Sequence, residues 1–272
     1  MASGLTGIVE HIPRVGDIGM PITLALFDMA ATTVDDTIDG RPLVLQSFAD
    51  SFNAVHVTVP GETLNAQRGK DKMEVFRTLL ASHGGLYGDA LEQTAQRLLE
   101  HFTVQLLRNI ERLREMPGAT TAFRFLKQHG VFIALGSGFP LDVTQAIARH
   151  LGWSTAGLVD YVTCGEAAGA GRPHPHMLHR ALQAAGLLPS EIPVDRVLPD
   201  FDYSQVLKVG DTVQDVAEGR NVGALTLAVT SGTQTAETLE KAGPTAVLPS
   251  VAALPAWLMA HGYVAHRTVE TH

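Results

Sequence analysis

The sequence predicts an α/β protein with a doubly wound, Rossmann-like parallel sheet and a helical segment inserted after the first strand. Short apolar runs alternate with helical stretches from residue 119 to residue 261, which is the pattern of successive βαβ units. Residues 42–115 instead read as mostly helical, with few prolines and no alternating strand pattern. The expected division is an N-terminal extension over residues 1–20, an α/β core over residues 21–35 and 117–272, and a helical cap domain over residues 36–116.

The first strand is expected from Ile22 to Phe27, whose residues are apolar or β-branched without regular alternation. That texture is typical of a strand covered on both faces in a parallel sheet. In the cap, the clearest helix is expected from Ala90 to Leu113, where apolar residues recur near helical spacing. Met116-Pro117-Gly118 breaks the helical pattern. The cap is therefore expected to end at this break and to lie over the strand ends.

After the break, strands and helices are expected to alternate. Strands are expected at residues 131–135, 161–164, 206–209, 225–229 and 246–248, and helices at residues 119–129, 141–151, 173–185, 215–222 and 251–261. Pro173 or Pro175 opens the third of these helices, and Gly186 stops it. Helical connections between successive strands predict parallel pairing and a doubly wound sheet.

Composition narrows the function classes. The chain has 272 residues, of which 45% are hydrophobic and 18% charged, as expected for a globular protein of one large or two modest domains. A net charge of -8 and scattered basic residues argue against nucleic-acid binding. The sequence contains neither an apolar run of about 18 residues, the length of a membrane span, nor a secretory signal. We therefore expect no membrane partner and a cytoplasmic location. The single Cys164 excludes an internal disulfide.

Polar residues follow three of the predicted strands directly. They are Asp28 with Thr32 and Thr33, Ser137 with Gly136 and Gly138, and Asp211 with Thr212 and Asp215. In open α/β sheets the carboxyl ends of the strands form the ligand-binding edge. Metal-assisted phosphoryl transfer needs a carboxylate nucleophile, a further carboxylate for Mg²⁺, and donors and a cation for the phosphoryl oxygens. Taken alone, Asp28 is equally well explained as the residue of an Asx-turn or as a helix cap.

Other polar residues near these strand ends are interpreted individually. Arg172 precedes a predicted helix and can supply the cation, because guanidinium forms forked hydrogen bonds with phosphate oxygens. A histidine cluster looks like a metal site, but residues two apart do not share a helix face, so a metal role is disfavoured. Its members are His174, His176 and His179. Asp35, Asp36 and Asp39 are expected to be caps or solvated turn residues rather than ligands.

Three motifs carry a resemblance to a known family. The loop Asp28 to Asp35, DMAATTVD, matches the family pattern DWAGTTVD at all but two positions. Lys208 to Asp215, continued by Glu218 to Asn221, is similar to the family's acidic motif. Gly171-Arg172-Pro173, with Pro175 and Met177 after it, resembles GRPxPxM. On these motifs the chain resembles a haloacid dehalogenase (HAD) superfamily hydrolase of the phosphonatase (phosphonoacetaldehyde hydrolase) branch, over roughly Ile22 to Thr230.

The resemblance implies the HAD fold and a set of roles. Asp28 would attack phosphorus and become an aspartyl phosphate. Mg²⁺ would be held by Asp28, the backbone carbonyl of Ala30 and Asp211. The substrate or phosphate would be bound by Thr32, Ser137, Gly138 and Arg172, and the site would be supported by Thr212 and Asp215.

Ala30 and Lys72 set the expected reaction. In ordinary phosphatases of the superfamily the position of Ala30 is an Asp that acts as general acid, and alanine cannot donate a proton. Phosphonatases instead use a cap lysine that condenses with the substrate aldehyde. Gly69-Lys70-Asp71-Lys72 resembles that cap motif, and Arg68 and Lys70 could favour the neutral amine that an imine requires. The alternatives are a solvated lysine on an exposed helix face and a lysine that only grips a substrate phosphate or carboxylate.

Three departures leave the substrate open. Val75 stands where the family has His, Phe139 where an aromatic hydroxyl is expected, and Arg68 where it has Met. The leading hypothesis is Mg²⁺-dependent cleavage of a carbon–phosphorus bond in a small organophosphorus compound. The alternatives are a phosphate monoester phosphatase of the same superfamily and a binding or regulatory protein on a retired enzyme scaffold. A homodimer formed through the cap is a further expectation.

Overall fold

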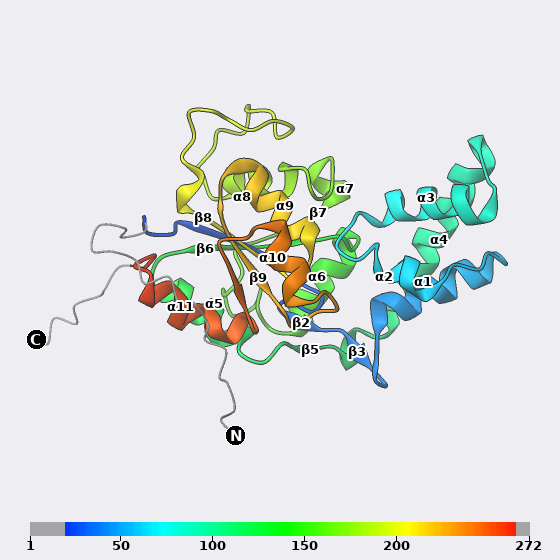
Figure 1. The fold of residues 1–272 in the computed structure, drawn as a ribbon, viewed down its shortest axis with the longest axis horizontal. Coiled ribbons are helices and arrows are strands. Elements are labelled where there is room, and N and C mark those ends of the chain that lie inside the picture. The colour runs from blue at the N-terminus through cyan, green and yellow to red at the C-terminus, as the bar shows by residue number, and fades with distance from the viewer. Residues whose placement is uncertain (1–19, 265–272) are drawn as a thin grey trace, which may run out of the picture.

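The computed structural model describes residues 20–264, so the predicted extension over residues 1–20 lies outside the described residues except for Met20. Within that range a six-stranded parallel sheet has the order β10-β9-β8-β1-β6-β7 (Figure 1). Its strands are β1 Leu24–Phe27, β6 Phe132–Ser137, β7 Tyr161–Cys164, β8 Val206–Gly210, β9 Leu225–Val229 and β10 Ala246–Leu248. The predicted doubly wound α/β fold is confirmed.

Helices cover both faces of this sheet. They are α5 Ala119–Gln128, α6 Leu141–His150, α7 Gly165–Ala168, α8 His176–Ala184, α9 Val213–Val222, α10 Ala236–Ala242 and α11 Leu254–Ala260, with short 3₁₀ turns η2 Tyr203–Gln205 and η3 Val251–Ala253. Ala25 and Phe27 belong to the same core cluster as residues of α5, α6 and α11. Leu24 and Leu26 pack with α8 in a second cluster on the other face. This double burial explains why β1 has no polar alternation.

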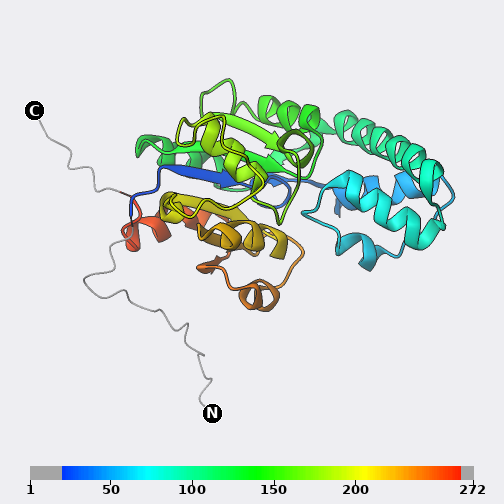
Figure 2. The same ribbon diagram turned by 90° about the horizontal axis from the view of Figure 1, so that it is seen from above.

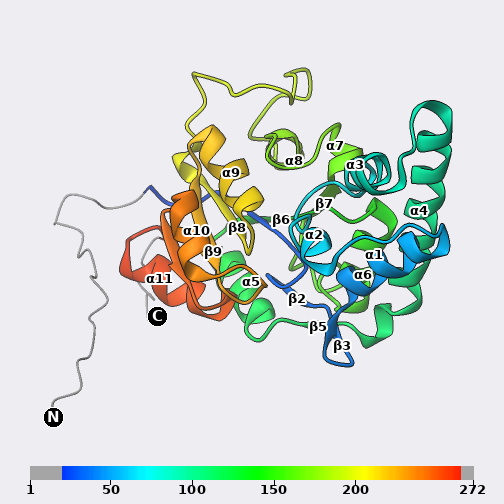
Figure 3. The same cartoon turned by 45° about the vertical axis from the view of Figure 1, so that its right-hand side comes forward.

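A separate group of helices lies beyond one end of the sheet. These are α1 Leu43–Ala54, α2 Gly61–Asn65, α3 Lys72–Gly84 and α4 Gly88–Arg108, followed by the 3₁₀ turn η1 Ile110–Arg112. Figures 2 and 3 show them together on the side away from α11. Phe48, Phe52, Phe76 and Phe102 pack at their centre with ring centroids 5.0 to 5.9 Å apart. We refer to these helices, with the loops between them, as the cap.

One cap helix, α4, ends before the residue that periodicity predicts, and the start of another, α3, positions Lys72. The helix expected from Ala90 to Leu113 ends at Arg108, because the backbone tightens there into a 3₁₀ turn in which the N–H of Arg112 donates to the Asn109 carbonyl at 3.0 Å. Helix α3 begins at Lys72, where the Asp71 side chain accepts a hydrogen bond from the Glu74 N–H at 3.1 Å. This N-cap fixes the position of Lys72 in the first turn.

Two short antiparallel ribbons were not predicted. β2 Val34–Asp35 pairs with β5 Arg114–Glu115, and β3 Thr37–Ile38 pairs with β4 Arg41–Pro42. Strands of two residues are too short to show a period in the sequence. β2 lies where the chain leaves the core for the cap, and β5 lies where it returns, so the β2–β5 pair holds these two connecting segments together. Among the described helices, none combines the length and hydropathy that a membrane-spanning segment needs.

Candidate active site

The strand register brings the predicted site residues to one level of the sheet. Phe27, the last residue of β1, is paired with Leu135 of β6 and Val209 of β8. The next residue, Asp28, donates its N–H to the Val209 carbonyl at 2.9 Å. The chain moves from β1 to β6 and β7 on one side and later to β8, β9 and β10 on the other. Asp28 therefore lies at the topological switch point, where such sheets bind ligands.

The loop after β1 is a tight turn that fixes the carboxylate. The N–H groups of Thr33 and Val34 both donate to the Met29 carbonyl, at 2.9 and 2.8 Å. The Thr32 hydroxyl donates to Asp211 Oδ1 at 3.1 Å and lies 3.4 Å from Asp28 Oδ2. Thr32, predicted to bind phosphate, thus bridges the two carboxylates at the ends of β1 and β8.

Arg172 is held inside the core by carboxylates on three sides. Its Nη2 lies 2.7 Å from Asp28 Oδ1, and its Nε lies 2.9 Å from Asp215 Oδ1 and 3.3 Å from Glu218 Oε2. It also donates to the Gly136 carbonyl at 2.5 Å and the Gly69 carbonyl at 3.1 Å. Most of its donors are therefore used within the protein, and its contact with Asp28 orients the predicted nucleophile.

Lys208 is a buried cation for which its motif predicted no separate role. It lies in β8, and its Nζ is 2.8 Å from Asp215 Oδ1 and 3.0 Å from Glu218 Oε2, with all three side chains fully buried. A lysine inside an otherwise apolar strand was the available signal, because lysine is almost never fully buried unless it is paired. Arg172 and Lys208 together neutralise Asp215 and Glu218 beneath the site.

Burial and like charges separate the pKa values of the three aspartates. Burial raises the pKa of Asp28, although Arg172 opposes it. Burial, together with the charges of Asp28 and Asp215, raises the pKa of Asp211 well above its ordinary value. Burial also acts on Asp215, but Arg172 and Lys208 outweigh it and leave that pKa below its ordinary value. Asp28 and Asp211 are therefore carboxylates that a nearby cation would favour in the charged form.

These carboxylates fit a divalent metal ion. Asp28, Asp211 and Asp215 each offer an oxygen, and these oxygens lie within 4.8 Å of one another. Asp211 Oδ2 is buried and has no hydrogen-bond partner. Asp215 faces two cations, because its Oδ1 forms ion pairs with Arg172 and Lys208, and its Oδ2 accepts a hydrogen bond from the Thr212 hydroxyl. Among the described residues Asp28 forms an ion pair with Arg172 alone, so Asp28 and Asp211 are the carboxylates more available to Mg²⁺, which prefers such oxygen ligands.

A small cavity of about 20 Å³ lies between this edge of the sheet and the cap. It is lined by Asp28, Ala30, Val44, Arg68, Gly69, Lys72, Ser137, Gly138, Phe139, Arg172, Asp211 and Thr212. All of the predicted site residues line it except Thr32 and Asp215, which are hydrogen-bonded to residues that do. A volume of about 20 Å³ accommodates roughly one water molecule. A substrate can therefore enter only if the cap moves away from the core.

Lys72 reaches into this cavity from the first turn of α3. It is 3% exposed, which rules out the expectation of a solvated lysine on an exposed helix face. Its Nζ donates to the Lys70 carbonyl at 2.8 Å and lies 5.6 Å from the ring centroid of Phe48 and 5.8 Å from that of Phe139. Burial, opposed by Asp71 and assisted by Arg172, lowers the pKa of Lys72 to about 8. A substantial fraction of neutral amine is therefore present near pH 8.

The expected effect of neighbouring cations on Lys72 is only partly found. Arg68 contributes to lowering the pKa of Lys72, but burial is the main cause. The Lys70 ammonium instead donates to Gln67 Oε1 at 3.0 Å and does not line the cavity.

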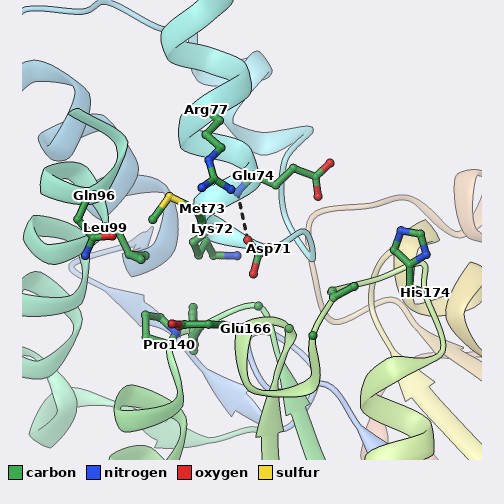
Figure 4. A pocket seen from close by; sticks show the side chains of 16 residues that line it. Asp71, Lys72, Met73, Glu74, Arg77, Gln96, Leu99, Pro140, Glu166 and His174 are labelled. Carbon is green, nitrogen blue, oxygen red and sulfur yellow. Dashed lines mark hydrogen bonds between the residues drawn. The ribbon is translucent and has the colours of Figure 1, made fainter. Parts of the chain in front are cut away.

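A larger cleft of about 490 Å³ lies on the other side of Lys72. Its walls come from the cap helices α3 and α4 and from core loops after β6 and β7, and Figure 4 shows Arg77, Glu74, Glu166 and His174 around it. Lys72 lines both this cleft and the small cavity. The cleft is thus the larger of the two spaces that Lys72 borders.

Ser137 lines the cavity as expected, whereas Asp36 and the histidine cluster have structural contacts. The Ser137 hydroxyl accepts the Phe139 N–H at 3.0 Å, which leaves its own hydrogen free to donate into the cavity. Asp36 is buried rather than solvated, because it accepts the Val44 N–H and faces Arg68. His179 uses both ring nitrogens, with the Val194 carbonyl and the Tyr203 hydroxyl, and so does not form a metal cluster with His174.

Close backbone contacts dock the cap loop on the core. A Cβ added at Gly138 would lie 2.5 Å from the Lys70 carbonyl oxygen and 2.8 Å from Lys72 Nζ. Gly69 has a φ of +80°, and a Cβ there would lie 2.6 Å from the Thr212 hydroxyl oxygen. Only glycine allows the two surfaces to approach this closely.

Gly138→Ala is therefore expected to hold the cap loop away from the core and to lower kcat/KM by about 10- to 100-fold, because small misplacements at a reacting centre cost this much. Steady-state kinetics on the chain's substrate measure the effect. Gly61→Ala in α2 is the matched control, since nothing lies within 4 Å of its added Cβ. Equal activity of the Gly138 and Gly61 variants would show that this close approach is unnecessary.

The chain is similar to hydrolases in sequence and in fold. The family model described as haloacid dehalogenase-like hydrolase matches residues 22–223. The phosphonoacetaldehyde hydrolase of Bacillus cereus (strain ATCC 10987 / NRS 248) is 25% identical over 267 residues, covering 93% of both chains. The structure of a phosphonoacetaldehyde hydrolase-like protein from Oleispira antarctica has a TM-score of 0.70 at 18% identity, covering 90% of this chain and 94% of that one. That of a hydrolase from Pseudomonas syringae has a TM-score of 0.72 at 17% identity, covering 87% and 98%.

Proposed function

The chain belongs to the haloacid dehalogenase-like hydrolases, and we propose that it cleaves the carbon–phosphorus bond of a small phosphonate that carries a carbonyl group. The observation that supports this most directly is the pairing of Ala30 with a buried Lys72 in one cavity. Ala30 offers no proton to an alkoxide leaving group, whereas Lys72 offers an amine with a pKa lowered to about 8. The similarity to a phosphonoacetaldehyde hydrolase points to the same chemistry.

In the proposed reaction the neutral Lys72 amine adds to the carbonyl carbon, and uptake of a proton from solvent with loss of water gives a protonated imine. This step turns the carbon attached to phosphorus into a stabilised leaving group. The apolar surroundings of Lys72, provided by Phe48 and Phe139, favour the neutral amine that begins the step.

Asp28 then attacks phosphorus. The electron pair of the carbon–phosphorus bond moves into the imine and produces an enamine, while the phosphoryl group is transferred to Asp28. Arg172 holds Asp28 Oδ1 at 2.7 Å, which leaves Oδ2 as the attacking oxygen. The Ser137 hydroxyl donates to a phosphoryl oxygen.

The catalytic groups are regenerated by water. Water hydrolyses the aspartyl phosphate to inorganic phosphate and Asp28. The enamine takes up a proton on carbon, and a second water releases the aldehyde and the free Lys72 amine. Mg²⁺, held by Asp28, Asp211 and the backbone carbonyl of Ala30, would supply positive charge against the phosphoryl oxygens. Asp215 and Thr212 support these ligands from behind.

A phosphate monoester phosphatase is the second candidate. It is favoured by the hydrogen bond from Lys72 Nζ to the Lys70 carbonyl at 2.8 Å, which suits a lysine that stays protonated. In that case Lys72 would only bind the substrate as a cation.

The pH profile separates the two candidates because they need opposite forms of Lys72. If Lys72 forms an imine, kcat/KM is expected to rise about tenfold per pH unit up to about pH 8 and then to level off, since the neutral amine is the reactant. If Lys72 acts as a cation, kcat/KM should fall above about pH 8. A profile measured from pH 6 to 9.5 in the presence of Mg²⁺ decides between them.

The direct test of the activity is inorganic phosphate release with Mg²⁺ from phosphonoacetaldehyde, run beside a panel of phosphate monoesters. The proposal predicts that the phosphonate is turned over and that chelation of Mg²⁺ abolishes the release. Turnover confined to the monoesters would replace the proposal with the second candidate.

A further inference from the structure

Arg68 is a buried cation in the active-site cavity whose long ion pair with Asp36 leaves part of its guanidinium without a hydrogen-bond partner. It lies in the turn before α3, four residues before Lys72, is 4% exposed, and lines the cavity with Asp28 and Lys72. Its Nη1 is buried and has no hydrogen-bond partner. Its Nη2 lies 3.7 Å from Asp36 Oδ1, which is too long for a hydrogen bond.

The other cations of the site are differently placed. Arg172 is bound by three carboxylates and two carbonyls, and Lys208 by two carboxylates. Lys72 is the amine proposed to react with the carbonyl. Among the cations that line the cavity, Arg68 is thus the one with a guanidinium nitrogen, Nη1, that is buried without a hydrogen-bond partner. A buried donor without a partner is costly, so a group that satisfies Arg68 should be strongly preferred.

We propose that Arg68 binds a carboxylate on the organic part of the substrate, so that the preferred substrate class is a 2-oxo carboxylate with a phosphonate on the next carbon. This inference rests on the proposed function. A planar guanidinium matches a carboxylate through two parallel hydrogen bonds. Because Arg68, in the turn before α3, and Lys72, in its first turn, line one cavity, a carbonyl on Lys72 brings its attached carboxylate toward Arg68.

The chemistry at phosphorus is unchanged in this substrate class. The Lys72 imine forms at the 2-oxo carbon, and the electron pair of the carbon–phosphorus bond enters the resulting enamine. One water is consumed, in hydrolysis of the aspartyl phosphate. The water lost when the imine forms is taken up again when the imine is hydrolysed. The products are therefore inorganic phosphate and a 2-oxo acid.

Binding of two inert analogues tests the role of Arg68 without requiring turnover. 3-Phosphonopropionate and propylphosphonate have the same chain and differ only in a terminal carboxylate or methyl group. With Mg²⁺ present, the wild-type chain is expected to bind the carboxylate at least about 10-fold more tightly, as a charge-assisted hydrogen bond would give. Arg68→Met is expected to abolish this preference and to leave propylphosphonate affinity within about threefold, while Arg68→Lys keeps part of it.

Several outcomes would overturn the inference. Equal binding of the two analogues by the wild-type chain removes the carboxylate site. Equal weakening of both analogues by Arg68→Met assigns Arg68 to the phosphoryl group instead. Arg112→Met is the matched control, because it removes an exposed Arg–Asp pair, Arg112 with Asp39 at 2.8 Å, away from the cavity. Replacing Arg68 leaves the buried Asp36 carboxylate without its cation. If Arg68→Met fails to fold for this reason, the double variant Asp36→Asn, Arg68→Met also removes that charge, and binding of the two analogues is compared in the double variant instead.

A turnover arm separates this inference from the proposed function. The wild-type chain is expected to release phosphate from 3-phosphonopyruvate with a kcat/KM at least about 10-fold above that for phosphonoacetaldehyde, and Arg68→Met is expected to reverse the order. Phosphate release from neither compound, with the binding preference intact, would contradict the proposed function and leave the carboxylate site standing. Turnover of phosphonoacetaldehyde without any preference for the carboxylate analogue would support the proposed function and contradict the carboxylate site.

Discussion

Asp28→Asn is expected to lower phosphate release by at least about 10³-fold, because loss of a covalent nucleophile removes the reaction path rather than one contact. The amide keeps the size of the side chain but cannot accept the phosphoryl group as a carboxylate does. Single-turnover phosphate release, with Mg²⁺ and with the preferred substrate, measures the loss.

The structure provides a control for this substitution. Asp202→Asn alters an exposed aspartate that caps η2 and is expected to leave activity unchanged. Circular dichroism should show that the Asp28 variant is folded, because Arg172 keeps Asp215 and Glu218 as partners. Unchanged turnover in folded Asp28→Asn would favour the binding or regulatory protein on a retired enzyme scaffold.

Lys72→Arg is expected to lower the rate of carbon–phosphorus cleavage by about 10³-fold or more, since a guanidinium keeps the positive charge but cannot form an imine. The charge-preserving change separates covalent chemistry from electrostatic binding. If Lys72 only grips the substrate, the variant should keep activity within about tenfold.

Lys70→Arg is the matched control for this second variant. It makes the same charge-preserving exchange two residues away, at a lysine whose side chain bonds Gln67 rather than lining the cavity. Initial rates on phosphonoacetaldehyde for the two variants, compared with wild type, give the result. A Lys72→Arg rate close to that of Lys70→Arg would contradict the imine.

The sheet could be predicted from sequence because its strands are local, mostly apolar runs, which are buried throughout in β1, β8 and β9. Tyr161–Cys164 and Leu225–Val229 have the predicted bounds, and β8 extends only one residue beyond the run expected at 206–209. The strand ends then follow, because parallel strands bring their carboxyl ends to one edge. Asp28, Ser137 and Asp211 could therefore be expected together before the fold was seen.

The partners of the buried charges could not be predicted in the same way. Arg172 and Glu218 are 46 residues apart, and nothing local in the sequence says that they meet. Arg172 was expected to face phosphate, yet most of its donors hold protein groups. Arg68 and Asp36 likewise meet only because the cap folds back over the strand ends.

The most direct measurement of the proposed reaction is borohydride trapping, with the product followed by intact-protein mass and peptide mapping. The chain is incubated with phosphonoacetaldehyde and Mg²⁺, with and without borohydride. The imine mechanism predicts that borohydride stops phosphate release and leaves one substrate-derived adduct on Lys72. Phosphate release that survives borohydride, with no adduct on Lys72, would contradict it.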